Sequence, residues 1–386
     1  MFRLRKNTLQ QIFLNAISAM KRSNNATKII ASPVPKEIPG AFIAHQTNDR
    51  RIHLYHWTGK SNEDLVNNPA FLGLGSNGVV QKTVHLSTGE VSALKTIRSD
   101  LPLVKRQSQK RSLLTEYDWM QKLSQDPQAI GFVKAPRVLI LDGDMTGMIG
   151  HLYAGDLFKF AEFADRYQAS VGDVMNGLLT VLKAMQYLKN HSIAHRDIKL
   201  GNVLFEVVNG KLSCVLSDFG GMRTCAEIAA RHFVSDTRFS DIFYQAQLKQ
   251  SKAPYAKYKD FIEKLDIYSF GLLMINLFTL EEQPNPPSLS HYENRISDIY
   301  GADIDTILKG IFSAKPDGRP SVEAVIAAFE AFLNDQTPEG ISRRQQAFNK
   351  KLQDNVACST QPRALKVHSD DALPSKQGIL KTRSLE

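Results

Sequence analysis

The chain has 386 residues, of which 42% are apolar and 23% charged, which excludes wholesale disorder and leaves room for two lobes with tails. The net charge of +9 comes from the two ends, because residues 41–333 hold 32 basic and 32 acidic side chains, and this balance disfavours a nucleic-acid groove. No run of 18 apolar residues is present to span a membrane, and three widely spaced cysteines exclude a disulfide scaffold and favour a reducing, cytoplasmic location.

The N-terminal segment, residues 1–40, carries seven basic side chains and one acidic side chain. Apolar residues recur at helical spacing from Leu9 to Met20, which predicts an amphipathic helix. Such a helix is typical of a membrane-surface or targeting segment, so residues 1–30 would give a peripheral membrane or partner contact, as would suit a bacterial protein delivered into a host cytoplasm. A helix packed on the body of the protein is the alternative. Residues 31–40 contain three prolines and predict a linker.

The region from 68 to 148 has mostly the two-residue alternation of β-strands. Ser87-Thr88-Gly89 separates two alternating apolar runs, which is a hairpin signal. One stretch, residues 111–123, has helical spacing instead and predicts an amphipathic helix.

The region from 156 to 333 is mostly helical in its pattern, apart from a strand, an Asn-Gly turn and a second strand in residues 203–220. We therefore predict an α+β fold in which a small β-rich lobe, residues 41–150, precedes a larger helical lobe, residues 151–333. Residues 334–386 are polar with little periodicity, which predicts a disordered tail. The helices are expected in the apolar-periodic stretches 171–189, 266–280 and 321–333.

A glycine-rich string, GxGxxGxV, is formed by Gly73, Gly75, Gly78 and Val80. A dinucleotide-binding turn would join a strand to a helix, whereas strand-like residues follow this string, so we expect the glycines between two strands. Glycines there let backbone N–H groups approach phosphate oxygens without obstruction by side chains. A flexible hairpin without a ligand is the alternative.

A lysine and a glutamate are spaced as a phosphate-binding pair would require. Lys95 follows Ala93 at the end of a predicted strand, and Glu116 lies 21 residues later on the predicted helix. A lysine that grips phosphates needs a carboxylate to hold it in place. Glu116 as a solvated surface charge is the alternative.

The string His-Arg-Asp-Ile-Lys-Leu-Gly-Asn at 195–202 gathers an acid, a cation and an amide in one loop. Asp197 can take the proton of an attacking hydroxyl, Lys199 can neutralise a transferred phosphoryl group, and Asn202 can bind Mg²⁺. Asp218 follows 21 residues after Asp197, within an Asp-Phe-Gly string, where its carboxylate can chelate Mg²⁺.

In this order, the motifs resemble the eukaryotic-type serine/threonine protein kinase superfamily over about 68–333. Asp266 resembles the aspartate of the family's DxWSxG segment, and Arg319 resembles its late arginine. Lys199, two residues after the catalytic aspartate, is the pattern of serine/threonine kinases. The resemblance implies a bilobal kinase fold and the use of ATP and Mg²⁺.

The resemblance also implies a role for each motif residue. Asp197 would be the catalytic base with Arg196 and Lys199 beside it, and Asn202 and Asp218 would hold the metal. The hydrophobic stack between the lobes would include Met120, His195 and Phe219, and the back of the adenine pocket would be Ile149 or Met148. The nucleotide would be bound by Gly73, Gly75, Gly78, Val80, Ala93, Lys95, Glu116 and Leu204.

The segment 222–265 departs from the family pattern. Ala253-Pro254-Tyr255 stands where the family has Ala-Pro-Glu, so Arg319 needs another acid, for which Glu263 is the candidate. Arg196 before the catalytic aspartate indicates activation by phosphorylation, or else contact with an acidic side chain, Asp236 or Asp241. The candidate phosphate acceptors are Thr224, Ser235, Thr237 and Ser240.

The sequence thus predicts a protein kinase that acts on serine and threonine of protein substrates, with no nucleic-acid partner and with its oligomeric state left open. A pseudokinase or docking module that acts by binding is the alternative. A small-molecule kinase shares the Asp…Asn loop, but Lys199 and the Asp-Phe-Gly string disfavour that class.

Overall fold

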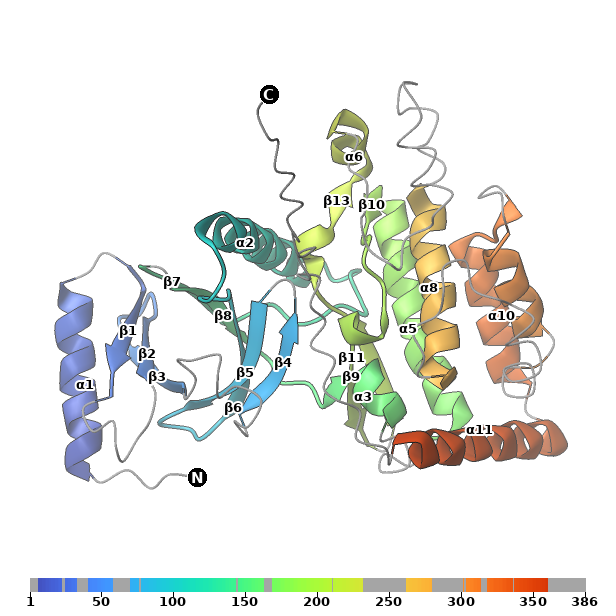
Figure 1. Ribbon diagram of the computed structural model, residues 1–386, viewed down its shortest axis with the longest axis horizontal. Helices are drawn as coiled ribbons and strands as arrows, with labels where there is room; N and C mark the ends of the chain where they lie inside the picture. The colour runs from blue at the N-terminus through green and yellow to red at the C-terminus, as the bar shows by residue number, and fades with distance from the viewer. Residues whose placement is uncertain are drawn as a thin grey trace, which may run out of the picture.

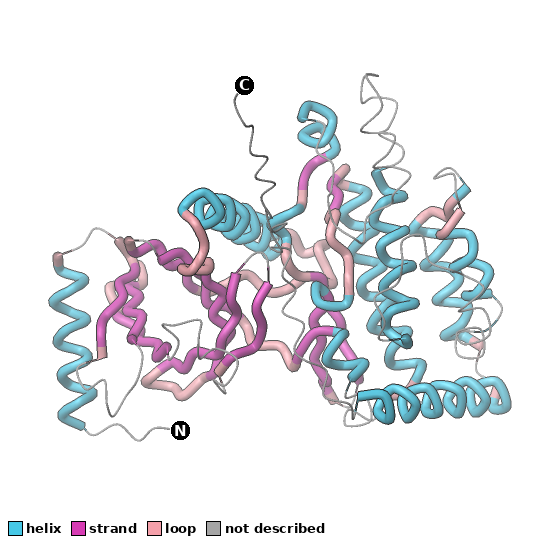
Figure 2. The backbone as a smooth tube through the Cα atoms, in the orientation of Figure 1, coloured by secondary structure: helices cyan, strands magenta, loops and turns pink. Residues whose placement is uncertain are grey.

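The computed structural model has a mixed α/β architecture, in which an antiparallel sheet precedes a group of helices (Figure 1). Figure 2 shows that most strands gather at the N-terminal side and most long helices at the C-terminal side. The structure describes residues 6–22, 25–32, 41–57, 70–75, 78–143, 145–162, 169–209, 211–231, 262–279, 301, 303–313, 318–335 and 337–359.

The large sheet has eight strands in the order β1-β2-β3-β5-β6-β8-β7, with β4 paired to β5. The hairpin predicted around Ser87-Thr88-Gly89 is present as β5 and β6, with Gly89 at a positive φ of 72°. The strands are β1 (Thr27–Ala31), β2 (Ala41–Gln46), β3 (Ile52–Trp57), β4 (Phe71–Gly75), β5 (Gly78–His85), β6 (Val91–Thr96), β7 (Val138–Asp142) and β8 (Met145–Gly150).

The predicted N-terminal helix is α1 (Lys6–Lys21), and it packs on the sheet. Ile12, Ala16 and Met20 recur every four residues, so they lie on one face, and all three are buried. They form a cluster with Phe42 of β2 and Leu54 of β3. This face therefore belongs to the protein's own core. The alternative prediction, a helix packed on the body of the protein, is the one that agrees with the structure.

The first strand, β1, falls inside the segment that the sequence assigned to an N-terminal extension and linker. It pairs with β2 along its whole length, from Thr27 opposite His45 to Ala31 opposite Ala41. Only Ala31 of this strand falls in the predicted linker, 31–40, and Thr27–Ile30 fall in the predicted segment 1–30, so the sheet extends to residue 27. Residues 33–40 lie outside the described residues.

The two outermost strands of the sheet, β1 and β7, lie next to each other. The carboxylate of Asp142 accepts hydrogen bonds of 2.7 Å from the backbone N–H of Ile29 and from Lys28 Nζ, and Thr27 Oγ1 accepts one of 3.3 Å from Leu141 N–H. The sheet therefore curls round on itself and is joined at this seam by side chains. It encloses an apolar cluster of Ile43, Tyr55, Leu94, Val138, Ile140 and Ile149.

The helical part confirms the three predicted helical stretches as α5 (Val171–Asn190), α8 (Ile262–Thr279) and α10 (Val322–Asn334). The predicted strand pair is present as β11 (Val203–Val208) and β12 (Lys211–Leu216), with Asn209 in the turn at a φ of 53°. The remaining elements are α2 (Leu103–Gln125), β9 (Gly155–Asp156), α3 (Leu157–Glu162), β10 (Ile193–Ala194), β13 (Arg223–Thr224), α6 (Cys225–Arg231) and α11 (Pro338–Ser359).

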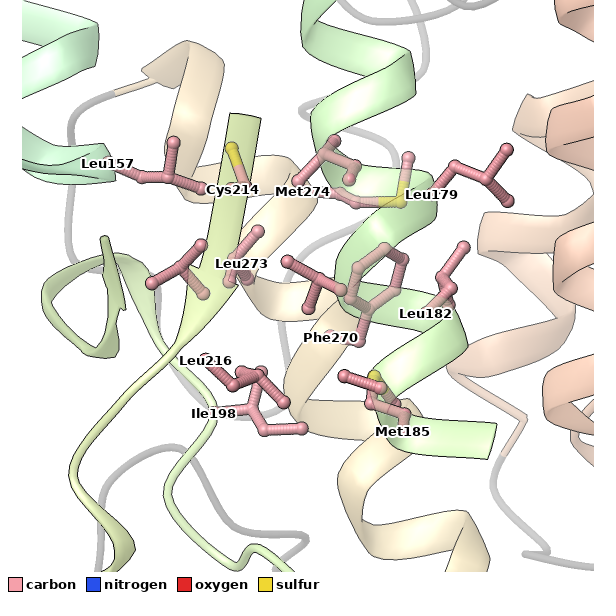
Figure 3. Packing of buried hydrophobic residues seen from close by; sticks show 14 of the residues in the cluster. Leu157, Leu179, Leu182, Met185, Ile198, Cys214, Leu216, Phe270, Leu273 and Met274 are labelled. Atoms are coloured by element: carbon pink, nitrogen blue, oxygen red, sulfur yellow. The ribbon is translucent and has the colours of Figure 1, made fainter. Parts of the chain in front are cut away.

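The core of this part lies between α5, α8 and the β11–β12 hairpin. Figure 3 shows Leu182 and Met185 of α5 facing Phe270 of α8, with Leu216 of β12 beside them. Residues 265–277 of α8 are all buried, which identifies α8 as a central helix covered on every side. Ser170 and Asp173 form a reciprocal capping box that fixes the start of α5.

The sequence assigned residues 334–386 to a disordered tail. Part of that segment forms the helix α11, and this helix is docked on the helical part. Phe348 is 1% exposed and belongs to the main core cluster. Gln345 Oε1 accepts a 3.0 Å hydrogen bond from the N–H of Val171, one of the otherwise unpaired donors at the start of α5. Because Phe348 is the one aromatic side chain in this mostly polar helix, its sequence shows little apolar periodicity.

Candidate active site

The glycine string forms the tip of a β-hairpin, as predicted. Gly75 of β4 is paired with Gly78 of β5, and Gly73 lies opposite Val80. A Cβ atom on Gly78, whose φ is 145°, would lie 2.3 Å from the carbonyl oxygen of Thr96, so only glycine fits there. The hairpin thereby presents bare backbone beside the end of β6, where Lys95 lies.

Lys95 lies in a buried cluster of charges with Glu116, the acid predicted for it, and with Asp218, which was predicted as a metal ligand. Its Nζ is 2.6 Å from Glu116 Oε2 on α2 and 3.3 Å from Asp218 Oδ1. Burial alone would lower the pKa of Lys95, but the carboxylates of Asp218 and Glu116 outweigh it and raise that pKa. Burial raises the pKa of Glu116 to about 7 against the opposing charge of Lys95. Lys95 is therefore a fixed cation.

The face of the sheet that carries Lys95 is defined by the register of its neighbours. Lys95 lies opposite Val80 of β5 and Met148 of β8. Met148 therefore shares the face of Lys95, whereas Ile149 lies opposite Leu94 and belongs to the cluster inside the curled sheet. Of the two candidates for the back of the adenine pocket, only Met148 is on the correct face, because neighbouring residues of a strand point to opposite sides.

Two further residues predicted to bind the nucleotide lie where the two parts of the chain meet. Ala93 is paired with Gly150, the last residue of β8. Leu204 of β11 is paired with Asp156 of β9 and is partly buried against the main core. The two side chains thus come from either side of the segment 151–154, which joins β8 to β9.

The loop that carries Asp197 is held by a buried carboxylate on α8. Asp266 accepts hydrogen bonds from the backbone N–H groups of His195, at 2.8 Å, and Arg196, at 2.9 Å. Burial raises the pKa of Asp266, against these hydrogen bonds and nearby positive charges. Arg196 has a positive φ of 73°, a strained conformation for a side-chain-bearing residue, and the two hydrogen bonds help to hold it.

Asp197 uses only one of its carboxylate oxygens inside the protein. Oδ2 accepts hydrogen bonds from Lys199 Nζ at 2.9 Å and from Asn202 Nδ2 at 2.8 Å. Oδ1 is buried and has no hydrogen-bond partner among the residues that the structure describes. A buried carboxylate oxygen without a donor is costly, and such groups mark places where a ligand supplies the missing hydrogen bond.

The predicted stack of Met120, His195 and Phe219 is assembled. The rings of His195 and Phe219 lie edge to face with centroids 5.9 Å apart, and Met120 belongs to the same core cluster as Phe219. Sequence analysis missed Phe132, whose ring meets Phe219 edge to face at 5.9 Å. Phe132 stands in an irregular segment, so no periodicity identifies it.

The Asp-Phe-Gly string also packs tightly against α2. Asp218 has a left-handed conformation, with φ 62° and ψ 69°. A Cβ atom on Gly220 would lie 2.1 Å from Ser112 Oγ, so a glycine permits the close approach of α2 to this turn. Ser112 was not among the predicted site residues, because it contributes close packing against Gly220 and no group to the chemistry.

The structure describes only some of the residues in the part of the predicted pattern that follows Asp218. Arg196 donates a 3.1 Å hydrogen bond to the carbonyl of Gly221, and Thr224 shares hydrogen bonds with Glu227. Arg319 is buried, donates to the carbonyls of Ser313 and Lys264, and stacks on Tyr268 at 4.7 Å. The side chain of Glu263, residues 253–255, and Ser235, Asp236, Thr237, Ser240 and Asp241 lie outside the described residues.

With this geometry in place, the comparison with known sequences is decisive. The sequence model of the family described as "Protein kinase domain" matches residues 67–328. The chain belongs to the protein kinase family. This match spans the glycine hairpin, Lys95, the Asp197 loop, Asp218 and the helices α5 and α8.

Two relatives of the kinase are distant. It is 25% identical over 276 residues to the dual specificity mitogen-activated protein kinase kinase dSOR1 of Drosophila melanogaster, covering 69% of this chain and 59% of that protein. It is 24% identical over 283 residues to the probable serine/threonine-protein kinase nek3 of Dictyostelium discoideum, covering 66% of this chain and 22% of that protein. The chain thus spans less than two thirds of either relative.

Proposed function

We propose that this member of the protein kinase family has the family's bilobal fold and transfers the γ-phosphoryl group of Mg²⁺-ATP to serine or threonine hydroxyls of proteins. The observation that carries the proposal is the buried Oδ1 of Asp197, which has no donor in the described part of the chain, while Oδ2 is held by Lys199 and Asn202. A substrate hydroxyl is a donor of the kind that this oxygen lacks, and the same oxygen would orient it and take its proton.

The remaining side chains supply position and charge. Lys95, held by Glu116, places a permanent cation beneath the glycine hairpin, where phosphate oxygens need one. Lys199, beside Asp197, would balance the negative charge that develops on the transferred group. Phosphoryl transfer needs little covalent help from a protein, so positioning and charge would supply most of the rate.

The acidic and amide side chains fit a magnesium ion. Asp218 offers a carboxylate. The side-chain Nδ2 of Asn202 is turned toward Asp197, which leaves the side-chain Oδ1 of Asn202 for another partner. Magnesium is usually held by one or two such oxygens together with substrate phosphates. In the described part of the chain no three His, Cys, Asp or Glu side chains gather into a metal site, which agrees with that kind of shared binding. The bound ion would neutralise phosphate charge.

Preference for serine and threonine is supported by Lys199, two residues after the proposed base, and by the relative from Dictyostelium discoideum, which is named as a probable serine/threonine-protein kinase. The Drosophila melanogaster relative is named as dual specificity, so tyrosine is the acceptor against which to test.

A radiolabelled Mg²⁺-ATP assay tests the proposal, with a generic basic protein and the enzyme itself as acceptors. We expect label in phosphoserine or phosphothreonine from the wild type and none from Lys95→Met or Asp218→Ala. Circular dichroism of both variants controls for folding. Nucleotide binding by the wild type without any transfer would favour a pseudokinase that acts by binding. Transfer to sugars or amines instead of protein would favour a small-molecule kinase, and an active Asp218→Ala would remove the metal assignment.

A further inference from the structure

A groove of about 460 Å³ lies between α1 and the turn that joins β2 to β3. Helix α1 stands at the end of the molecule that is far from α8 and α10 (Figure 1). The groove is lined by four apolar side chains, two cations and Gln46. The apolar side chains are Phe13, Ile17, Met20 and Ile52, and the cations are Lys21 and Arg50.

The helix beside this groove has a second apolar stripe, separate from the face that packs on the sheet. Leu14 is 53% exposed and Ile17 is 37% exposed. Leu14, Ile17 and Lys21 are spaced by three and four residues, so they form one stripe along α1. A helix that packs on its own domain needs only one apolar face, and among the described residues Leu14 and Ile17 remain exposed beside it.

The cations at the groove have no countercharge of their own. Neither Lys21 nor Arg50 has a side-chain partner in the part of the chain that the structure describes, and the neighbouring Arg51 already neutralises Asp49 at 2.9 Å. Residues 1–57 hold nine basic and two acidic side chains, against 39 and 37 in the other 329 residues. The sequence of residues 1–57 is therefore strongly basic, whereas the rest of the chain is nearly balanced.

We propose that this end of the kinase docks on the surface of a membrane that contains anionic lipids. Leu14 and Ile17 enter the interface between headgroups and acyl chains, and Lys21 and Arg50 bind the lipid phosphates. The stripe continues from the groove onto the convex surface of α1, since Leu14 is not part of the groove lining, and such a surface fits a bilayer better than a short peptide. In the described part of the chain no helix is long and apolar enough to span a membrane, so the contact is peripheral.

The proposal does not rest on kinase activity, so the test uses binding of the full-length chain to vesicles. Cosedimentation is measured with phosphatidylcholine vesicles alone and with added phosphatidylserine. The wild type is expected to bind only the second kind, less tightly as salt is raised. Lys21→Gln together with Arg50→Gln should weaken binding roughly fivefold per charge, since each basic residue near such a surface contributes about 1 kcal/mol. Leu14→Ser with Ile17→Ser should also weaken it.

A matched control removes two exposed cations from other places, Lys110→Gln on α2 and Arg343→Gln on α11. This control should bind like the wild type, and thermal melting of every variant checks that it folds. The proposal is overturned if the wild type does not bind anionic vesicles, if it binds both kinds equally, or if the control weakens binding as much as the Lys21 and Arg50 pair does. Binding to polyglutamate without binding to vesicles also overturns it, in favour of an acidic protein partner.

Discussion

Asp266 Oδ2 lies 2.8 Å from the backbone nitrogen of His195, although the two residues are 71 positions apart. A side chain of the central helix α8 thereby holds the backbone of the loop that presents Asp197. The hydrogen bond is buried, so it is protected from competition with water. The position of the proposed catalytic base is thus set by the core of the helical part.

Replacement of Asp266 by asparagine should therefore reduce turnover while leaving substrate affinity nearly unchanged. An asparagine has a single acceptor oxygen, and its NH₂ group would face one of the two backbone N–H groups. A loop displaced by about 1 Å costs on the order of 100-fold in rate. Steady-state kinetics of Asp266→Asn should show this loss in kcat. A rise in KM with an unchanged kcat would contradict the positioning role.

The pair of Lys95 and Glu116 can be tested by removing the charge of the acid only. Glu116→Gln should lower kcat/KM for ATP by roughly 10- to 100-fold, because a hydrogen bond to a charged group contributes about 1.5–3 kcal/mol. Since the pKa of Glu116 is about 7, the wild type should also lose activity as the pH falls from 8 to 6 and the carboxylate takes a proton. A Glu116→Gln variant with the same pH profile as the wild type would argue against this titration.

Packing of α1 predicts different effects for two neighbouring apolar side chains. Ile12 is fully buried against the sheet, so Ile12→Ala should lower the free energy of unfolding by about 2–5 kcal/mol. Leu14 is 53% exposed, so Leu14→Ala should change it by about 0.5 kcal/mol or less. Urea denaturation of both variants provides the comparison. Equal effects would mean that the helix is not held by its buried face.

The C-terminal helix α11 gives a similar pair. Phe348→Ala should destabilise the protein by about 3–5 kcal/mol, because the ring is buried in the main core. Ile341→Ala on the same helix should change the stability by about 0.5 kcal/mol or less, since Ile341 is 41% exposed. Thermal melting distinguishes the two, and a Phe348→Ala protein as stable as the wild type would show that α11 is not needed for the fold.

The ion pair that joins α10 to α5 should make stability depend on pH. Burial alone would raise the pKa of Glu323, but hydrogen bonds from Lys189, its own backbone and Ser321 outweigh it and lower the pKa from 4.5 to about 2. A lowered folded-state pKa means that this stabilisation is fully present above pH 4.5 and is lost as the pH falls toward 2.

Glu323→Gln should therefore melt slightly below the wild type at pH 7, by no more than about 2 °C for a partly exposed pair. The difference should shrink as the pH falls below 4.5. Calorimetry at a series of pH values measures it, and a difference that grows in acid would have the wrong sign.

The residues proposed to carry the chemistry could be selected from the sequence because the motifs are local. Glycines in a hairpin, an Asp-Phe-Gly turn and the loop around Asp197 are each short, and their order along the chain restricts how they can meet. Lys95 and Glu116 are 21 residues apart, and the apolar spacing of α2 already placed Glu116 on a helix; the structure brings the two together at 2.6 Å.

Other features depended on contacts between distant segments, which no local pattern reports. The choice of Met148 over Ile149 needed the register of β6 against β8. Pairing of β1 with β2, and its contact with β7 through Asp142, decided that residues 27–31 belong to the sheet. Burial of the Phe348 ring in the main core showed that the polar helix α11 is docked. Periodicity reveals that a side chain has an apolar face, but only the tertiary structure determines which surface buries it, because burial is a property of two partners.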